Sequence, residues 1–99
     1  MIVDVIQAAK NDVAMAYRFY EKQQKGLGSY FRECILEDLH ELGETAGIHR
    51  KISGYHHVNS KRFQSIIYYR INVETAVVVA ILDARINPNR RDRMLSGRS

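Results

Sequence analysis

Two apolar runs near the middle of the chain dominate its hydrophobic pattern. Residues 63–71 are rich in aromatic and β-branched side chains, and residues 77–82 are almost wholly aliphatic. The short and mostly polar segment 72–75 between them favours an antiparallel β-hairpin. Because the second run does not alternate apolar with polar residues, we expect both of its faces to be covered, as in a central strand.

The N-terminal half carries two helical patterns. Residues 8–25 repeat apolar side chains at helical spacing, and the glycines that follow end this pattern. A second apolar stripe runs from about residue 28 to residue 44. Since the connection is so short, the two helices should lie antiparallel. The expected core consists of Val13, Tyr17, Tyr20, Phe31, Ile35, Leu39, Ile67, Tyr69, Val78 and Ala80.

Two shorter segments complete the predicted sheet. Residues 2–6 alternate around Asp4, and residues 55–58 precede a turn signal and can pair with the hairpin. We therefore predict an α+β fold, in which an N-terminal antiparallel helical hairpin packs on one face of a small, twisted, mainly antiparallel sheet of about four strands. Residues 1–88 form the single domain. Residues 89–99 are an Arg-rich tail, which we expect to be mobile alone or to form a short helix against a partner.

Length and composition favour one small domain in the cytoplasm. A chain of 99 residues has no room for a second core. No apolar run approaches the roughly 18–20 residues that a membrane span needs, and the N-terminus lacks the features of a signal peptide. The lone Cys34 cannot form an internal disulfide, so it is most simply a reduced residue of a cytoplasmic protein.

The formal net charge of +4 conceals an uneven distribution. Residues 1–47 hold five Lys/Arg and eight Asp/Glu, which gives −3, whereas residues 48–99 hold ten Lys/Arg and three Asp/Glu, which gives +7. The second half therefore produces a positive field that attracts nucleic acid or an acidic protein.

Metal and nucleophile chemistry is not expected. His49, His56 and His57 are close in sequence, but adjacent residues of a strand point to opposite faces. The chain has no second cysteine and no HExxH spacing, so we predict no metal site. Cys34 lies on an apolar helical stripe, where a buried thiol is inert. No glycine-rich segment follows a strand as a phosphate loop requires, and no cofactor is expected.

Three segments resemble motifs of one protein family. Residues 62–71 read RFQSIIYYRI, residues 83–88 read DARINP, and residues 16–28 read AYRFYEKQQKGLG, followed by Phe31. In this order and at this spacing they resemble the RelE/ParE superfamily, whose members are toxins of bacterial type II toxin–antitoxin (plasmid stabilisation) systems. The resemblance covers residues 3–88 and is closer to the ParE branch.

The resemblance implies a RelE/ParE-like fold and a ParE-like toxin that inhibits DNA gyrase by protein contact. A cognate antitoxin, a small acidic or amphipathic chain that becomes ordered as it binds, would neutralise it, and higher-order toxin–antitoxin assembly is compatible with this scheme. No catalytic residue is needed for such contact. The candidate target-binding residues are Arg62, Arg70, Arg85, Arg90, Arg91 and Arg93.

A RelE-like, ribosome-dependent and metal-independent mRNA endoribonuclease is the alternative. Such cleavage needs a base for the 2′-hydroxyl, cations around the phosphate and an acid for the leaving oxygen. The candidates for these roles are Lys51, Lys61, Arg62, Arg85, His56 and His57. After Arg85, however, the chain has no Tyr, His, Lys or Glu, and arginine is a poor base. We therefore prefer the ParE-like interpretation, while Gln64, Ser65 and Asp83 depart from the family motifs and leave the target open.

Overall fold

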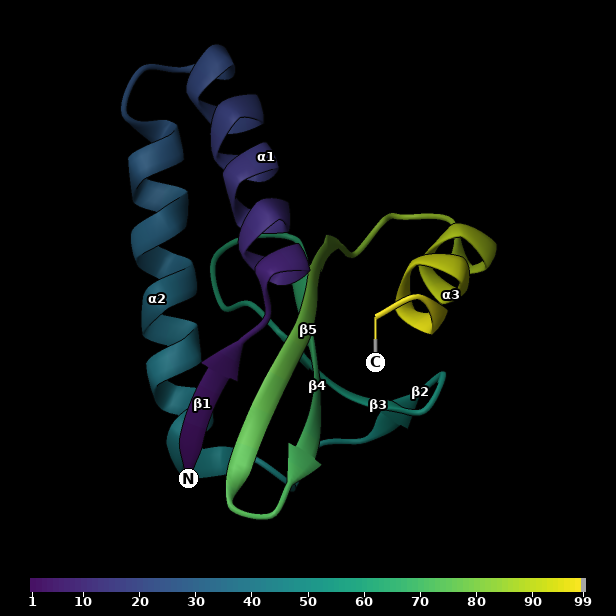
Figure 1. Cartoon of the computed structure of the whole chain (residues 1–99). Coiled ribbons are helices and arrows are strands. Elements are labelled where there is room, and N and C mark those ends of the chain that lie inside the picture. The colour runs from purple at the N-terminus through teal and green to yellow at the C-terminus, as the bar shows by residue number, and fades with distance from the viewer. Residues whose placement is uncertain (99) are drawn as a thin grey trace.

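Five strands form one sheet in the computed structural model, which describes residues 1–98 (Figure 1). They are β1 (Ile2–Val5), β2 (Lys51–Ile52), β3 (Tyr55–Asn59), β4 (Ser65–Asn72) and β5 (Thr75–Asp83). Their order is β1-β5-β4-β3-β2, in which β1 pairs in parallel with β5 and the other pairs are antiparallel. The predicted hairpin, the central position of its second strand and the mainly antiparallel sheet are confirmed. The sheet has five strands, against about four expected, because residues 51–52 also pair.

Helices α1 (Gln7–Gln23) and α2 (Leu27–Thr45) form the expected antiparallel hairpin beside the sheet (Figure 1). The carboxylate of Glu21 accepts hydrogen bonds of 2.9 Å from the backbone N–H groups of Gly26 and Gly28 and so fixes the link between the helices. A Cβ atom at Gly28 would lie 2.6 Å from the carbonyl oxygen of Tyr17. Glycine is therefore required there because the two helices approach so closely.

The sheet is covered on both faces. The helical hairpin buries Phe31, Ile35 and Leu42 against β4 and β5, in a cluster that includes Ile67, Tyr69 and Val78. A second cluster on the opposite face includes Tyr68, Val79, Ala80, Leu82 and Leu95. Coverage of both faces explains why residues 77–82 do not alternate in polarity.

A β-bulge in β5 corrects one part of the predicted core. Tyr68 pairs with Ala80 and Tyr69 pairs with Val78, so Val79 is an extra residue between them. Ala80 therefore lies on the face opposite the helical hairpin instead of beneath it. Tyr17 is also less buried than expected, since its hydroxyl lies 3.4 Å from Ser29 Oγ at the margin of the helical hairpin.

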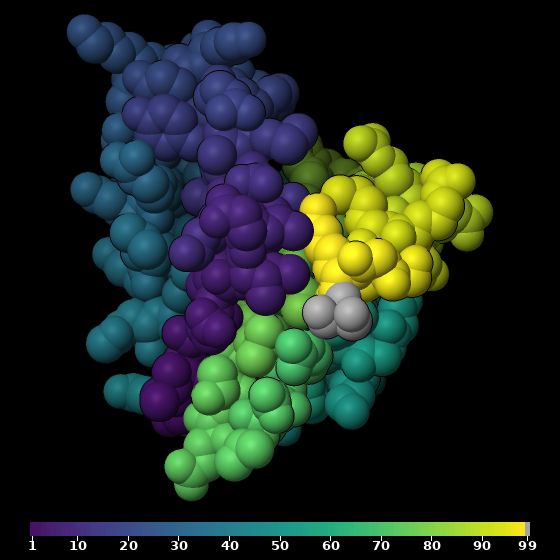
Figure 2. All heavy atoms as spheres, viewed as in Figure 1, coloured from purple at the N-terminus to yellow at the C-terminus, as the bar shows by residue number. Residues whose placement is uncertain are grey.

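The C-terminal segment forms α3 (Pro88–Ser96) and packs on the sheet of its own chain (Figure 2), in place of the mobile or partner-bound tail expected. The side-chain oxygen of Asn87 accepts from the N–H groups of Asn89 and Arg90, and Pro88 occupies the first turn. These are standard signals of a helix start. Leu95 anchors the helix, because its side chain is only 1% exposed.

The edge of β5 is completed by two side chains. Strand β1 pairs only with residues 75–78, so the rest of β5 extends beyond it. Asp12 Oδ2 of α1 accepts from Ile81 N–H at 3.0 Å, and Arg98 Nη1 donates to the carbonyl of Val79 at 3.2 Å. Arg98 also binds the Asp12 carboxylate with two hydrogen bonds of 2.5 and 3.0 Å. The pair therefore replaces the missing neighbouring strand and satisfies backbone groups of the bulged segment.

Replacement of Leu95 by alanine tests the position of α3. Because Leu95 is buried, Leu95→Ala should lower the free energy of unfolding by about 2–5 kcal/mol. The matched substitution Arg90→Ala, on the exposed side of α3, should change it by less than about 0.5 kcal/mol. Urea unfolding of both variants gives the measurement, and an unchanged midpoint for Leu95→Ala would show that α3 does not pack on the sheet.

Candidate functional surfaces

The six candidate target-binding arginines occupy three separate places. Arg62 and Arg85 lie at the end of the sheet where β4 begins and β5 ends. Arg70 lies within β4, opposite Val77 on the face that α3 covers. The remaining three, Arg90, Arg91 and Arg93, belong to α3. The structure therefore brings together Arg62 and Arg85 and leaves the others apart from them.

Arg62 and Arg85 are each paired with a carboxylate of their own chain. Arg62 Nη1 lies 2.9 Å from Glu37 Oε2. Arg85 binds Asp83 through Nε at 2.9 Å and Nη2 at 2.7 Å, and these hydrogen bonds lower the pKa of the Asp83 carboxyl group. All four side chains are largely exposed, and exposed pairs of this kind contribute little to stability. A partner's carboxylate can therefore replace Glu37 or Asp83 at small cost.

Four aromatic rings lie side by side near these two arginines. The ring centroid of Tyr20 is 5.3 Å from that of Phe19 and 5.0 Å from that of Phe63, and the Phe63 and Tyr30 centroids are 5.7 Å apart. We call Phe19, Tyr20, Phe63 and Tyr30 the aromatic band. Burial is the largest cause that raises the pKa of Tyr20, and the charges of Asp83 and Arg85 also act on it. Arg62 precedes Phe63 in the chain, and the N–H of Ala84, next to Arg85, donates to the carbonyl of Gln64 at 2.9 Å, so both arginines lie beside the band.

The six residues proposed for RNA cleavage do not form one cluster, although Lys61, Arg62 and Arg85 lie toward the same end of the sheet. Lys61 pairs with Glu41 of α2, and Arg85 pairs with Asp83. His56 stacks on Tyr69 on the helical-hairpin face, with ring centroids 5.0 Å apart, whereas His57 pairs with Tyr68 on the other face. Lys51 is exposed in the edge strand β2. The expectation that neighbouring histidines point to opposite faces of β3 is thus confirmed for His56 and His57.

Sequence reasoning missed a hydrogen-bonded cluster around Tyr69. Gly47 N–H donates to the Tyr69 hydroxyl oxygen at 2.9 Å, and His49 Nδ1 lies 2.5 Å from the same oxygen. Since the backbone N–H can only donate, the Tyr69 hydroxyl is free to donate its proton to His49. His56 Nδ1 lies 2.7 Å from the His49 carbonyl oxygen and donates to it. When the Tyr69 hydroxyl donates to His49, the His49 ring is neutral. No spacing in the sequence indicates this cluster.

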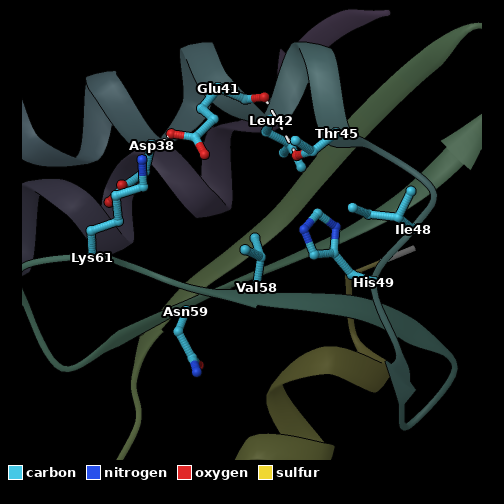
Figure 3. Close-up of a pocket in the computed structure, with 9 residues that line it drawn as sticks. All are labelled: Asp38, Glu41, Leu42, Thr45, Ile48, His49, Val58, Asn59 and Lys61. Atoms are coloured by element: carbon cyan, nitrogen blue, oxygen red, sulfur yellow. Dashed lines mark hydrogen bonds and ion pairs between the residues drawn. The ribbon is translucent and has the colours of Figure 1, made fainter.

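His49 also lines a cavity of about 240 Å³ between α2 and β3 (Figure 3). Its lining includes the apolar side chains of Leu42, Val58 and Ile48 and the charged side chains of Lys61 and Glu41. Among residues 1–98, no group of three or more His, Cys, Asp or Glu side chains is arranged to hold a metal ion. No helix within the same range is long and apolar enough to cross a membrane.

A second, more open hollow lies along the edge strand β1. Its volume is about 520 Å³, and one side is formed by Met1 and by Val3 and Val5 of β1. The α2 side is formed by Leu36, Leu39, His40, Gly43 and Glu44. Leu36 is largely exposed although it is apolar, as is Ile2 of the same edge. We call this hollow the β1–α2 groove.

The Tyr69 cluster predicts a pH-dependent stability. Burial is the largest cause that lowers the pKa of His49, and the charges of His56 and His57 lower it further. The unfolded chain, with an ordinary histidine pKa of about 6.5, therefore binds a proton more readily than the folded chain, so stability is lost as the pH falls below about 6.5.

Urea unfolding between about pH 5 and 8 measures this loss. His49→Gln should flatten the dependence, and His40→Gln on the exposed side of α2 should keep it. If the free energy of unfolding depends on pH equally in the two variants, His49 is not the source of the pH dependence.

Comparison with known proteins identifies a similar fold. The sequence matches no protein-family model and no curated protein. The structure is similar to that of a chain described as "Chromosomal ParDE TA system from P. aeruginosa". The TM-score is 0.74 at 16% sequence identity, and the match covers 84% of this chain and 95% of that chain. The chain therefore has a ParE-like α+β fold, as the three sequence motifs implied.

Proposed function

We propose that this chain is the toxin of a type II toxin–antitoxin module and acts in the cytoplasm. The observation that carries the proposal is the agreement between the fold and the motifs. The matched ParDE chain is covered almost completely, and the three motif segments lie at the helical hairpin and the central strands of the same fold. The positive charge of residues 48–99 supports an acidic macromolecular partner.

DNA gyrase, reached by protein contact, is the target that we propose. Contact requires an exposed surface and no proton-transfer group, and Arg62 and Arg85 lie beside such a surface. Cleavage of mRNA would require cations and an acid–base pair around one phosphate. The separate positions of Lys51, Lys61 and His57 therefore favour contact over cleavage.

The β1–α2 groove is the place that we propose for the antitoxin. Ile2 N–H donates to the carbonyl of Glu74, just before β5, and Ile6 N–H donates to that of Val78 in β5, so the N–H groups of Val3 and Val5 face the open edge. An extended segment can add a strand to such an edge and place apolar side chains in the groove beside it. An amphipathic antitoxin that becomes ordered on binding fits this surface.

Induction of the chain in bacterial cells tests the target. Growth should stop with DNA-damage signalling while messenger RNA stays intact. The double substitution His56→Gln with His57→Gln should leave this toxicity unchanged, since contact needs no histidine base. Messages cut at ribosomes, with the cutting lost in the double variant, would replace gyrase contact by RelE-like cleavage.

Co-expression with the small protein encoded next to this chain tests the antitoxin. The two should purify as a complex, and growth should recover. Leu36→Glu places a charge in the β1–α2 groove, so it should abolish recovery while toxicity persists. Ile48→Glu, at another exposed apolar residue that lies outside the groove, serves as the control and should keep recovery. Recovery with Leu36→Glu would exclude the groove as the antitoxin site.

A further inference from the structure

The aromatic band exposes more apolar surface than the core requires. Tyr20 and Phe63 pack against the buried Phe31, with centroids 5.0 Å from it. Phe19 and Tyr30 extend this cluster outward, and they are 55% and 47% exposed. Met15, one helical turn before Phe19, is 62% exposed. Single exposed apolar residues are ordinary, but rings in contact across three chain segments form a continuous patch.

The arginines beside the band give it the composition of a protein-binding surface. Aromatic residues and arginine are the side chains most enriched at the energetically dominant positions of protein interfaces. Arg62 and Arg85 hold exposed carboxylates that a partner can displace. Tyr30 and Phe19 supply apolar contact area between them, and their packing on Phe63 and Tyr20 limits the freedom that binding would remove.

The charge around the band selects an acidic partner. Arg18, Lys22 and Lys25 are exposed on the distal half of α1 and its link to α2, and within residues 1–98 none of them forms an ion pair. The nearby Glu21 carboxylate is occupied by two backbone N–H groups. Glu33 of α2, three residues after Tyr30, is also exposed and forms no ion pair within the described residues, but the three cations outweigh it. This end of the helical hairpin therefore presents net positive charge next to the rings, which steers negatively charged segments toward them.

We propose that the aromatic band is the surface that docks the target protein, through a target segment in which carboxylates flank an apolar or aromatic side chain. The apolar side chain lies on Phe19 and Tyr30, and the carboxylates replace Glu37 and Asp83 on Arg62 and Arg85. This inference rests on the proposed toxin function and adds the site of target contact to it. The docking surface shares no residue with the β1–α2 groove, so the target and the antitoxin use different parts of the chain.

Two double variants test the docking surface, one for its rings and one for its charges. Phe19→Ser with Tyr30→Ser and, separately, Arg62→Gln with Arg85→Gln should each weaken binding to purified DNA gyrase at least tenfold. Growth arrest in cells should be lost in parallel. Matched controls are Ile48→Ser with Val73→Ser for exposed apolar residues, and Lys10→Gln with Arg50→Gln for exposed cations. The controls should bind gyrase and arrest growth as the unmodified chain does.

The unmodified chain provides a readout that does not depend on the folding of any variant. Its association rate with gyrase should fall steeply as salt is added, because the proposed contact is steered by charge. A salt-independent rate would overturn the inference, as would double variants that bind and arrest growth like the unmodified chain. If the unmodified chain itself does not arrest growth, the toxin function fails and this inference fails with it. Growth arrest that persists in both double variants refutes only the docking surface.

Discussion

Strand β5 imposes the main constraint on this fold. Its side chains must be buried on both faces of the sheet, and its backbone groups must be hydrogen-bonded on both edges. The helical hairpin covers one face, and α3 covers the other. Strand β4 occupies one edge along its length, while β1 occupies only part of the second. The Asp12–Arg98 pair completes what β1 leaves open, and both side chains are mostly buried, at 8% and 16% exposure. Loss of either partner would leave a buried charge and unsatisfied backbone groups together.

Local patterns in the sequence were sufficient to predict the elements that depend on neighbouring residues. The β-hairpin follows from two apolar runs around residues 72–75, and the helical hairpin follows from two stripes around Gly26 and Gly28. The bulge at Val79 has no such local signal, because it is visible only in the pairing of β5 with β4. A helix in residues 89–99 was expected only against a partner and only as the alternative to a mobile tail, whereas Asn87 and Pro88 begin a helix that packs on the sheet of its own chain.

The candidate sites depend more strongly on tertiary structure. Arg62 and Arg85 could be selected from the motifs, but their common position at one end of the sheet depends on the pairing of β4 with β5. Tyr30 comes from α2 and Phe19 from α1, so their approach to Phe63 cannot be derived from spacing. The contact between His49 and Tyr69 similarly joins a loop to a central strand. The sequence supplied the residue types of these sites, and the fold supplied their proximity.

The parallel pairing of β1 with β5 also determines the order in which the chain can fold during synthesis. Residues 2–5 leave the ribosome long before their partners, residues 75–78, are made. Until then, the first strand is an unpaired apolar segment, and contacts between such distant residues form slowly. The α1–α2 hairpin can form earlier from local contacts. A nascent chain therefore passes through a stage in which the helical hairpin can form but β1 has no strand to pair with.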